Sequence, residues 1–354
     1  MVRLFFTNFA ARYKVKKMER IKKYWLVIVM VLFGIAVFYS MFMSRIDVEE
    51  TAYLYVDADD NGDSAKAKLD ALRVDYSKCG FSLMASLGKL DSHMRPGRYL
   101  ISRDMTTFDL FHSLRSHLTE PLGLVVPTAR TVEVMAGKLA SQLMVDSAHV
   151  ADYFLDDSVM AANGYTRETL PALFIPNTYE VFWELTPAAL TNRLVREHDA
   201  FWNFERKEKA RKAGLTPVEV ATLASIVDSE TANDGEKPRI AGLYINRLHK
   251  GIPLQSDPTI IFAVGDFSIK RVTGKYLQID SPYNTYRRKG LPPGPICIPS
   301  VVGIDAVLNY EHHDYIYMCA KEDFSGTHNF AVSYAEHSVN ARRYAEALNR
   351  RGIE

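Results

Sequence analysis

The sequence has few cysteines and little net charge, and it contains no low-complexity segment and no convincing internal repeat. Three cysteines in 354 residues, Cys79, Cys297 and Cys319, are too few and too scattered for a disulfide framework. Cys297 and Cys319 could pair in an oxidising compartment; alternatively, all three are small apolar fillers. With 47% hydrophobic and 24% charged residues, the composition is that of a packed globular protein, long enough for two domains and an anchor.

Sequence signatures of several enzyme classes are also missing. No G-x-S-x-G or comparable segment marks a serine or cysteine nucleophile. Histidines and acids gather at 311–314, His328 and His337, but neither HExxH nor another recognised metal-ligand spacing is present. We therefore expect neither a metal nor a cofactor.

One long hydrophobic run near the N-terminus is the strongest single signal. Residues 24–43 carry no charge, and about twenty such residues are what a helix needs to cross roughly 30 Å of hydrocarbon. Aromatic residues, which favour the membrane interface, stand near both ends of the run: Tyr24, Trp25, Tyr39 and Phe42. A cleaved signal peptide is the alternative, but its apolar core would be shorter, and no small-x-small cleavage site follows Ser40. We expect an uncleaved transmembrane helix.

Basic residues are concentrated before this run. Residues 1–23 contain eight lysines and arginines against Glu19 alone, which predicts a cytoplasmic N-terminus and an exported body after Met43. This arm carries +7, so from a total of +1 the rest of the chain carries −6. A mildly acidic exported body excludes nucleic acid as an expected partner.

Residues 44–120 alternate short strand-like and helix-like patterns. The predicted elements are strands at 52–56 and 97–101, helices at 64–74 and 81–90, and a helix opened by a capping box at Thr106–Asp109. This β-α-α-β-α order describes a small α+β module. By itself it does not indicate an activity.

Residues 121–354 form the larger part of the chain. A helix is predicted over 131–145, and two later helices start with Thr-Pro, at Thr186 and Thr216. Threonine suits the N-cap and proline suits the first helical position. Gly214 is predicted to close the first of these two helices.

Glu230 lies at the end of the second Thr-Pro helix, predicted over 216–231. At 100° per residue it shares one face with three apolar residues, Leu223, Ile226 and Val227. Desolvation in such surroundings tends to raise the pKa of a carboxylic acid, and a raised pKa suits a general acid near neutral pH.

The surroundings of Glu230 allow a second interpretation. Its carboxylate could simply form an ion pair with an arginine such as Arg239 or Arg247. Its neighbours Asp228 and Ser229 point to other sides of the helix, and we expect both to face solvent.

Polar, turn-rich loops follow this helix. They combine carboxylates, amides, tyrosines and prolines, and they lie at 254–259, 281–286, 290–295, 326–330 and 336–337. Sugar hydroxyls need directed hydrogen bonds and pyranose faces need aromatic platforms, so the set favours sugar recognition. Taken singly, most such loops are surface turns.

Four segments together resemble a known family. ASIVDSET, INRLHKGIPLQSDPT, SPYNTYRRKGLPPGPICIP and GTHNFAVSYAEH resemble, in order and spacing, the YceG-like family of endolytic murein transglycosylases. The resemblance covers essentially the whole exported part and implies an α+β fold, with a LysM-like module at 44–120 and a catalytic domain at 121–354. The family's catalytic acid is the second of a Glu-x-Glu-Thr pattern, which falls on Glu230, and Asp228 replaces the first.

This resemblance implies lytic cleavage of the MurNAc–GlcNAc bond in peptidoglycan, without water. The C6 hydroxyl of MurNAc attacks its own anomeric carbon to close a 1,6-anhydro ring, so Glu230 alone would donate and then accept the proton. An ordinary glycosidase needs two carboxylates. The residues expected to hold the sugars or the acid are Gln255, Asp257, Asn284, Tyr286, His328 and Glu336.

The resemblance also implies a place of action. An enzyme held at the plasma (inner) membrane, with its catalytic domain periplasmic or otherwise extracytoplasmic, would meet nascent glycan strands as they leave synthesis. We therefore expect termination of glycan elongation and partnership with cell-wall synthases.

Two functions of other classes remain open. A water-using muramidase needs a second acid facing Glu230, for which Asp257 is the best choice. A non-catalytic wall-binding scaffold would keep the fold, but it would not require an acid on an apolar helix face.

Overall fold

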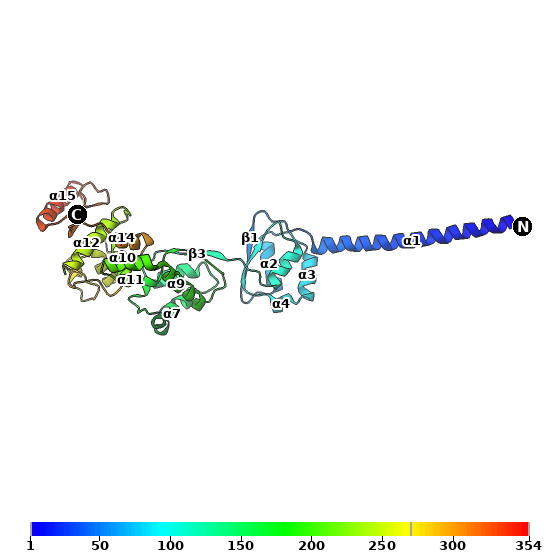
Figure 1. The fold of residues 1–354 in the computed structure, drawn as a ribbon, viewed down its shortest axis with the longest axis horizontal. Helices are drawn as coiled ribbons and strands as arrows, with labels where there is room; N and C mark the ends of the chain where they lie inside the picture. The colour runs from blue at the N-terminus through cyan, green and yellow to red at the C-terminus, as the bar shows by residue number, and fades with distance from the viewer. Residues whose placement is uncertain (1, 270, 353–354) are drawn as a thin grey trace. The chain divides into compact units, whose positions relative to one another are not determined.

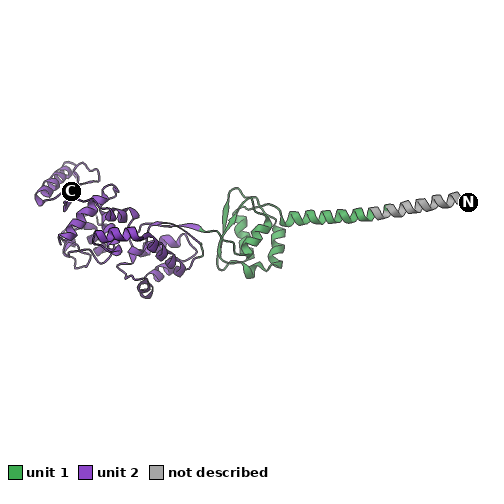
Figure 2. Ribbon diagram, viewed as in Figure 1, with its two compact units in different colours: residues 1–121, 182–184 green, residues 122–181, 185–354 purple. Residues whose placement is uncertain are grey.

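The computed structural model describes residues 2–269 and 271–352 and divides into two compact units (Figures 1 and 2). Unit 1 runs to Pro121 and includes Phe182–Glu184, and unit 2 contains the remainder. The side chains of residues 1–17 and 19–21, which include most of the predicted basic arm, lie outside the described part.

Helix α1 (Val2–Phe42) begins unit 1. Its segment Lys22–Phe42 has a mean hydropathy of 2.4 and is not buried, and it is the single described helix that is long and apolar enough to span a membrane. This confirms the predicted N-terminal apolar helix, whereas its orientation stays a prediction. The end of α1 packs directly on the following module, since a Cβ on Gly80 would lie 1.9 Å from the carbonyl oxygen of Met41.

The rest of unit 1 is a small α+β module. Its elements are β1 (Ala52–Val56), α2 (Gly62–Ala71), α3 (Lys78–Leu87), α4 (Leu90–His93), β2 (Gly97–Ile101) and α5 (Thr107–Arg115). Strands β1 and β2 pair antiparallel, with Leu54 opposite Tyr99, and both side chains are buried with Phe81. The predicted capping box opens α5, because the Asp109 amide donates to the Thr106 hydroxyl at 3.1 Å. The likeness to a LysM module stays a prediction.

Unit 2 begins with a helical layer around a two-stranded sheet. Its elements are β3 (Leu122–Val126), α6 (Val132–Ala140), α7 (Ser147–Phe154), α8 (Asp157–Ala162), η1 (Leu170–Leu173), β4 (Asn177–Val181) and α9 (Pro187–Phe201). Strands β3 and β4 pair antiparallel, and Leu124, Met135 and Phe174 belong to the core beneath them. The helix predicted over 131–145 is shorter, because it ends at Ala140.

The second part of unit 2 is built around a buried helix. Its elements are α10 (Phe204–Lys212), α11 (Pro217–Glu230), α12 (Lys237–His249), α13 (Asp257–Val264), η2 (Tyr276–Gln278), α14 (Val301–Leu308), β5 (Tyr317–Ala320), β6 (His328–Ala331) and α15 (Tyr334–Arg350). Helix α11 packs against α12 and α14, and β5 pairs antiparallel with β6. The core of this part centres on Leu223, Ile226 and Tyr244.

The prediction that Gly214 closes the first Thr-Pro helix is wrong. Helix α9 ends at Phe201, because the buried Trp202 leaves helical geometry and the Asn203 side chain accepts from the Arg206 amide to start α10. Gly214, with φ of 75°, follows α10 instead.

The cysteines do not form the possible Cys297–Cys319 disulfide, and all three are free. Cys79 is exposed, so it is not an apolar filler. Cys297 is largely enclosed, and burial raises the pKa of its thiol to about 11.

Candidate functional site

The centre of the candidate site is the C-terminal turn of α11. The helix starts at the predicted capping box, in which the Thr216 amide donates to the Glu219 carboxylate at 2.7 Å. Every residue from Val220 to Val227 is buried, so the core fixes the helix on all sides. Glu230, its last residue, is therefore held by a rigid element.

Two hydroxyl groups donate to one oxygen of Glu230. The Tyr244 hydroxyl lies 2.6 Å from Oε1 and the Ser256 hydroxyl lies 2.5 Å from the same atom. Oε2 accepts no hydrogen bond from the described residues. With Oε1 occupied by two donors, a proton on Glu230 belongs on Oε2, the oxygen left for a ligand.

Burial raises the pKa of Glu230, which is the largest influence on it. Hydrogen bonds from Ser256 and Tyr244 act in the opposite direction, the charge of Asp257 raises the pKa further, and His328 lowers it. The balance keeps the pKa above that of an ordinary glutamate. Burial also raises the pKa of Tyr244 well above its usual value, so this phenol stays a donor.

The alternative in which Glu230 pairs with an arginine is wrong. Arg239 pairs with Glu311 at 3.0 Å. Arg247 donates to the carbonyl oxygens of Pro253 and Ile316, at 2.9 and 2.7 Å. Among the described residues, Glu230 therefore has hydroxyl partners and no cationic partner.

A cavity of about 340 Å³, here called the Glu230 cavity, adjoins this carboxyl group. Its walls come from the end of α11, the middle of α12, residues 254–257, the loop with Tyr286, strands β5 and β6, and the start of α15. Besides Glu230, four of the predicted substrate-binding residues border it: Gln255, Asp257, Tyr286 and His328. Its size and its mixed lining suit a sugar-sized ligand.

Hydrogen bonds fix the orientation of these four side chains. Arg247 donates to the side-chain oxygen of Gln255, whose backbone has a φ of 56°. The Tyr286 hydroxyl donates to Oδ1 of Asp257 at 2.5 Å. Burial and this carboxylate raise the pKa of Tyr286, so it remains protonated.

His328 is positioned by the buried Glu236. The carboxylate accepts from the His328 amide and contacts Nδ1, both at 2.8 Å. Because a carboxylate is an acceptor, Nδ1 carries the hydrogen and Nε2 is the ring atom available to a ligand.

The structure does not bring Asn284 and Glu336 to the cavity. Asn284 is fully buried, and its amide donates to the carbonyl oxygens of Leu277 and Ile279 at 3.0 and 2.8 Å. Its side-chain oxygen accepts from the Tyr286 amide at 3.1 Å, so Asn284 orders the loop that presents Tyr286. Glu336 is exposed and belongs to the capping box of α15.

Sequence reasoning missed the groups that hold Glu230. Tyr244 and Ser256 lie 14 and 26 residues away in the chain, and Arg247 and Glu236 support other cavity residues. The one local signal was a tyrosine hydroxyl on the buried face of α12, between Leu243 and the apolar Ile245.

The expectation that Asp228 faces solvent is wrong. Its side chain is 12% exposed, and its carboxylate accepts from Lys237 at 2.8 Å and from the amide of Ser300 at 2.7 Å. A Cβ on Gly303 would lie 2.5 Å from this carboxylate, so a side chain at position 303 would displace Asp228 from its partners. Ser229 is exposed, as expected.

A buried carboxyl group with a raised pKa, bordering a polar cavity of a rigid α+β unit, describes a site for general acid–base chemistry. The YceG-like family model matches residues 54–343, and the chain belongs to this family. The family resemblance read from the sequence motifs is thus confirmed.

Curated relatives carry the name endolytic murein transglycosylase. The protein from Bacillus subtilis (strain 168) is 36% identical over 143 residues, which cover 40% of this chain and 39% of the relative. The protein from Streptococcus pneumoniae (strain R6) is 27% identical over 284 residues, which cover 72% of this chain and 51% of the relative. The chain thus spans about half of the length of these relatives, or less.

A solved structure supports the fold. The 2.6 Å crystal structure of a putative YceG-like protein from Listeria monocytogenes aligns with a TM-score of 0.56 and 24% identity. The alignment covers 82% of this chain and 99% of the Listeria chain. At this identity the likeness concerns the fold alone.

Proposed function

We propose that this protein is a membrane-anchored lytic transglycosylase that cuts peptidoglycan strands internally, between MurNAc and GlcNAc. The observation that carries the proposal is the environment of the Glu230 carboxyl group. Its pKa is raised, its Oε1 accepts from two hydroxyls, and its Oε2 is left for a ligand. The names of the curated relatives support the substrate class.

In the proposed reaction Glu230 acts twice. Its Oε2 proton passes to the glycosidic oxygen while the bond from that oxygen to the anomeric carbon of MurNAc breaks. The resulting carboxylate then takes the proton of the MurNAc C6 hydroxyl as this oxygen bonds to the same carbon. The products are a 1,6-anhydro-MurNAc end and a free GlcNAc hydroxyl, and Glu230 is protonated again.

Other cavity residues would hold the sugars. Gln255 and Asp257 offer acceptors, Nε2 of His328 offers a polar contact, and Tyr286 offers a ring face for a pyranose. Asn284 and Glu336 would act through the elements that they order, since neither borders the cavity.

The proposed division of the chain follows these roles. Residues 1–23 would form a cytoplasmic basic arm, 24–43 the membrane span, 44–120 a LysM-like glycan-binding module and 121–354 the catalytic domain. This division would put the site outside the cytoplasm, where the enzyme would shorten nascent strands beside the cell-wall synthases.

Asp257 supports a second candidate function. It borders the same cavity as Glu230, and its charge acts on the pKa of Glu230. A muramidase would use Asp257 to activate a water molecule, and its products would carry reducing ends.

Product mass separates these functions. The full chain in detergent is incubated with purified sacculi or uncrosslinked nascent strands, beside the variant Glu230→Gln, which keeps an acceptor for Tyr244 and Ser256. We expect anhydro ends, one water lighter than reducing ends, with a loss of at least about a hundredfold in rate for the variant.

The other outcomes are equally informative. Products with reducing ends would show that the protein is a muramidase and not a transglycosylase. Near-normal activity of Glu230→Gln would remove Glu230 from the chemistry. No cleavage of either substrate by the unaltered protein would favour a wall-binding scaffold.

A further inference from the structure

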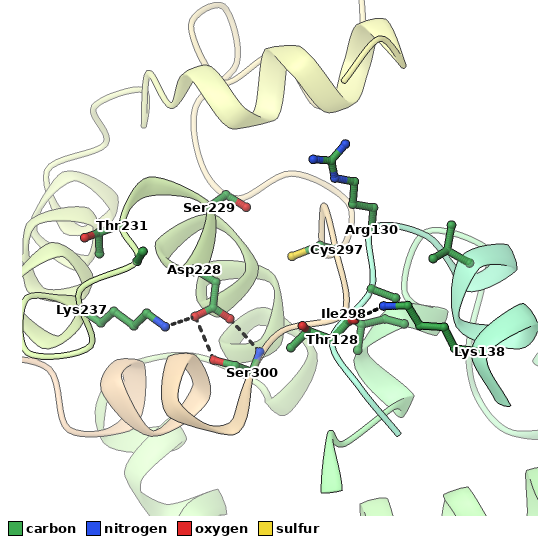
Figure 3. A pocket seen from close by; sticks show the side chains of 13 residues that line it. Thr128, Arg130, Lys138, Asp228, Ser229, Thr231, Lys237, Cys297, Ile298 and Ser300 are labelled. Carbon is green, nitrogen blue, oxygen red and sulfur yellow. Dashed lines mark hydrogen bonds and ion pairs between the residues drawn. The ribbon is translucent and has the colours of Figure 1, made fainter. Parts of the chain in front are cut away.

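A second and larger cavity, here called the Asp228 cavity, lies on the other side of the same helix end. Its volume is about 550 Å³. One wall comes from the C-terminal turn of α11, the start of α12 and Ser300, which is bonded to Asp228, and the facing wall comes from the segment before α6, from α6 itself and from Cys297 and Ile298 (Figure 3). The backbone bond from the Ile298 amide to the Ala129 carbonyl, at 2.8 Å, ties the two halves of the facing wall together.

Three basic side chains and one carboxylate, that of Asp228, line this cavity. Lys237 is neutralised by Asp228 and Asp234, each at 2.8 Å. Arg130 and Lys138, on the facing wall, form no ion pair with a carboxylate among the described residues. Their charges are therefore available to a ligand.

Arg130 and Lys138 make only weak contacts within the described part of the protein, so both remain free to bind an anionic ligand. The Arg130 guanidinium lies 5.0 Å from the ring centroid of Phe267, and Lys138 donates to the Thr128 carbonyl at 3.3 Å. A guanidinium binds a carboxylate through two parallel hydrogen bonds, and an ammonium group adds a point charge. An anion with one or two carboxylates matches this pair.

The location of the cavity connects it with the Glu230 cavity. Consecutive residues at the end of α11 border the two cavities. Asp228, Ser229 and Thr231 line the Asp228 cavity, and Glu230 lines the Glu230 cavity. Because the proposed enzyme cuts within a strand, its substrate extends beyond the cleaved bond. A group attached to the sugar chain beside that bond would reach across this turn.

We propose that the Asp228 cavity binds the acidic peptide carried by the muramic acid residue next to the cleaved bond, with Arg130 and Lys138 receiving its carboxylates. This inference rests on the proposed function. The hydroxyls of Thr128 and Ser229 suit peptide amides, and Val134 and Ala232 suit small apolar side chains. Arg130 and Lys138 thereby determine specificity for peptide-bearing strands.

Binding of a small probe tests this proposal without cleavage. The full chain carrying Glu230→Gln is titrated by calorimetry with N-acetylmuramyl-L-alanyl-D-glutamate and with the same compound after amidation of its carboxylates. We expect the acid form to bind at least about tenfold more tightly, and this preference to vanish in Arg130→Ala/Lys138→Ala. The matched control Lys207→Ala/Lys212→Ala removes two exposed lysines of α10 and should keep the preference.

Three outcomes would overturn the proposal. The two forms could bind equally, the acid form could fail to bind, or the preference for the acid form could persist in Arg130→Ala/Lys138→Ala. Cleavage supplies a second measurement on strands with free or amidated peptides. We expect amidation to lower kcat/KM of the unaltered protein about tenfold but not to affect the double variant. If the unaltered protein cleaves neither strand, the proposed function fails, and the titration still decides whether the cavity binds carboxylates.

Discussion

Tyr244→Phe tests the balance of influences that raises the pKa of Glu230. The substitution removes one of the two donors to Oε1, from a distance of 2.6 Å, and changes the shape of a fully packed side chain by one oxygen atom. The Tyr244 hydrogen bond lowers the pKa of Glu230, so its loss raises this pKa further.

The cost in stability should depend on pH. A hydrogen bond is worth about 0.5–1.5 kcal/mol between neutral groups and about 1.5–3 kcal/mol to a charged one. The pKa of Glu230 is raised on folding, so its ionisation destabilises the fold as pH rises through the folded-state pKa. At low pH, where Glu230 is neutral, Tyr244→Phe should therefore lower the free energy of unfolding by about 0.5–1.5 kcal/mol. At high pH, where Glu230 is charged, the loss should be about 1.5–3 kcal/mol.

Urea unfolding at several pH values and the pH dependence of kcat/KM measure these effects. Because the general acid must be protonated, the alkaline limb of the rate profile should move to higher pH in Tyr244→Phe. Tyr179→Phe is the matched control, since the buried Tyr179 donates to the neutral carbonyl of Ile175 at 2.8 Å. It should cost about 1 kcal/mol at every pH and leave the profile unchanged. If the alkaline limb of the rate profile stays at the same pH or moves to lower pH in Tyr244→Phe, the reasoning is refuted.

Three further substitutions separate stability from activity. Asp228→Ala removes the acceptor of the Ser300 amide and one of the two carboxylates paired with Lys237, and should cost about 1–3 kcal/mol in urea unfolding; unchanged stability would contradict the pairing. Asn284→Ala leaves two backbone carbonyls and the Tyr286 amide without partners, so it should cost about 1–3 kcal/mol and also lower the cleavage rate; an unchanged rate would separate this loop from substrate binding. Glu336→Ala weakens the cap of α15, so thermal unfolding should show a loss of about 0.5–1 kcal/mol with little change in kcat/KM, and a large fall in kcat/KM would give Glu336 a role at the site.

Local signals explain what the sequence could predict. The strands 52–56 and 97–101 have the predicted bounds, and α11 starts at its predicted capping box, because alternation and capping depend on residues close in the chain. Glu230 could be placed on an apolar helix face for the same reason.

Long-range contacts explain what the sequence could not predict. The donors Tyr244 and Ser256 reach Glu230 only when α12 and the 254–257 loop have packed on α11. Asp228 looked solvated because Lys237 and Ser300 approach it from other elements. The break after α9 depends on burial of Trp202, which a helical pattern does not reveal.

The close packing of Gly80 on Met41 has a mechanical consequence for a protein anchored in a membrane. A carbonyl of the last turns of α1 occupies the space that a side chain at position 80 would need, so the helix passes into the module without slack. As the proposed membrane anchor, the helix would then act as a rigid support, in contrast to a flexible tether of many residues. In the proposed membrane-anchored enzyme, lengthening or tilting this helix would change the height and angle at which the module stands on the bilayer, so the length of the helix relative to the bilayer thickness would set the distance of the module from the membrane.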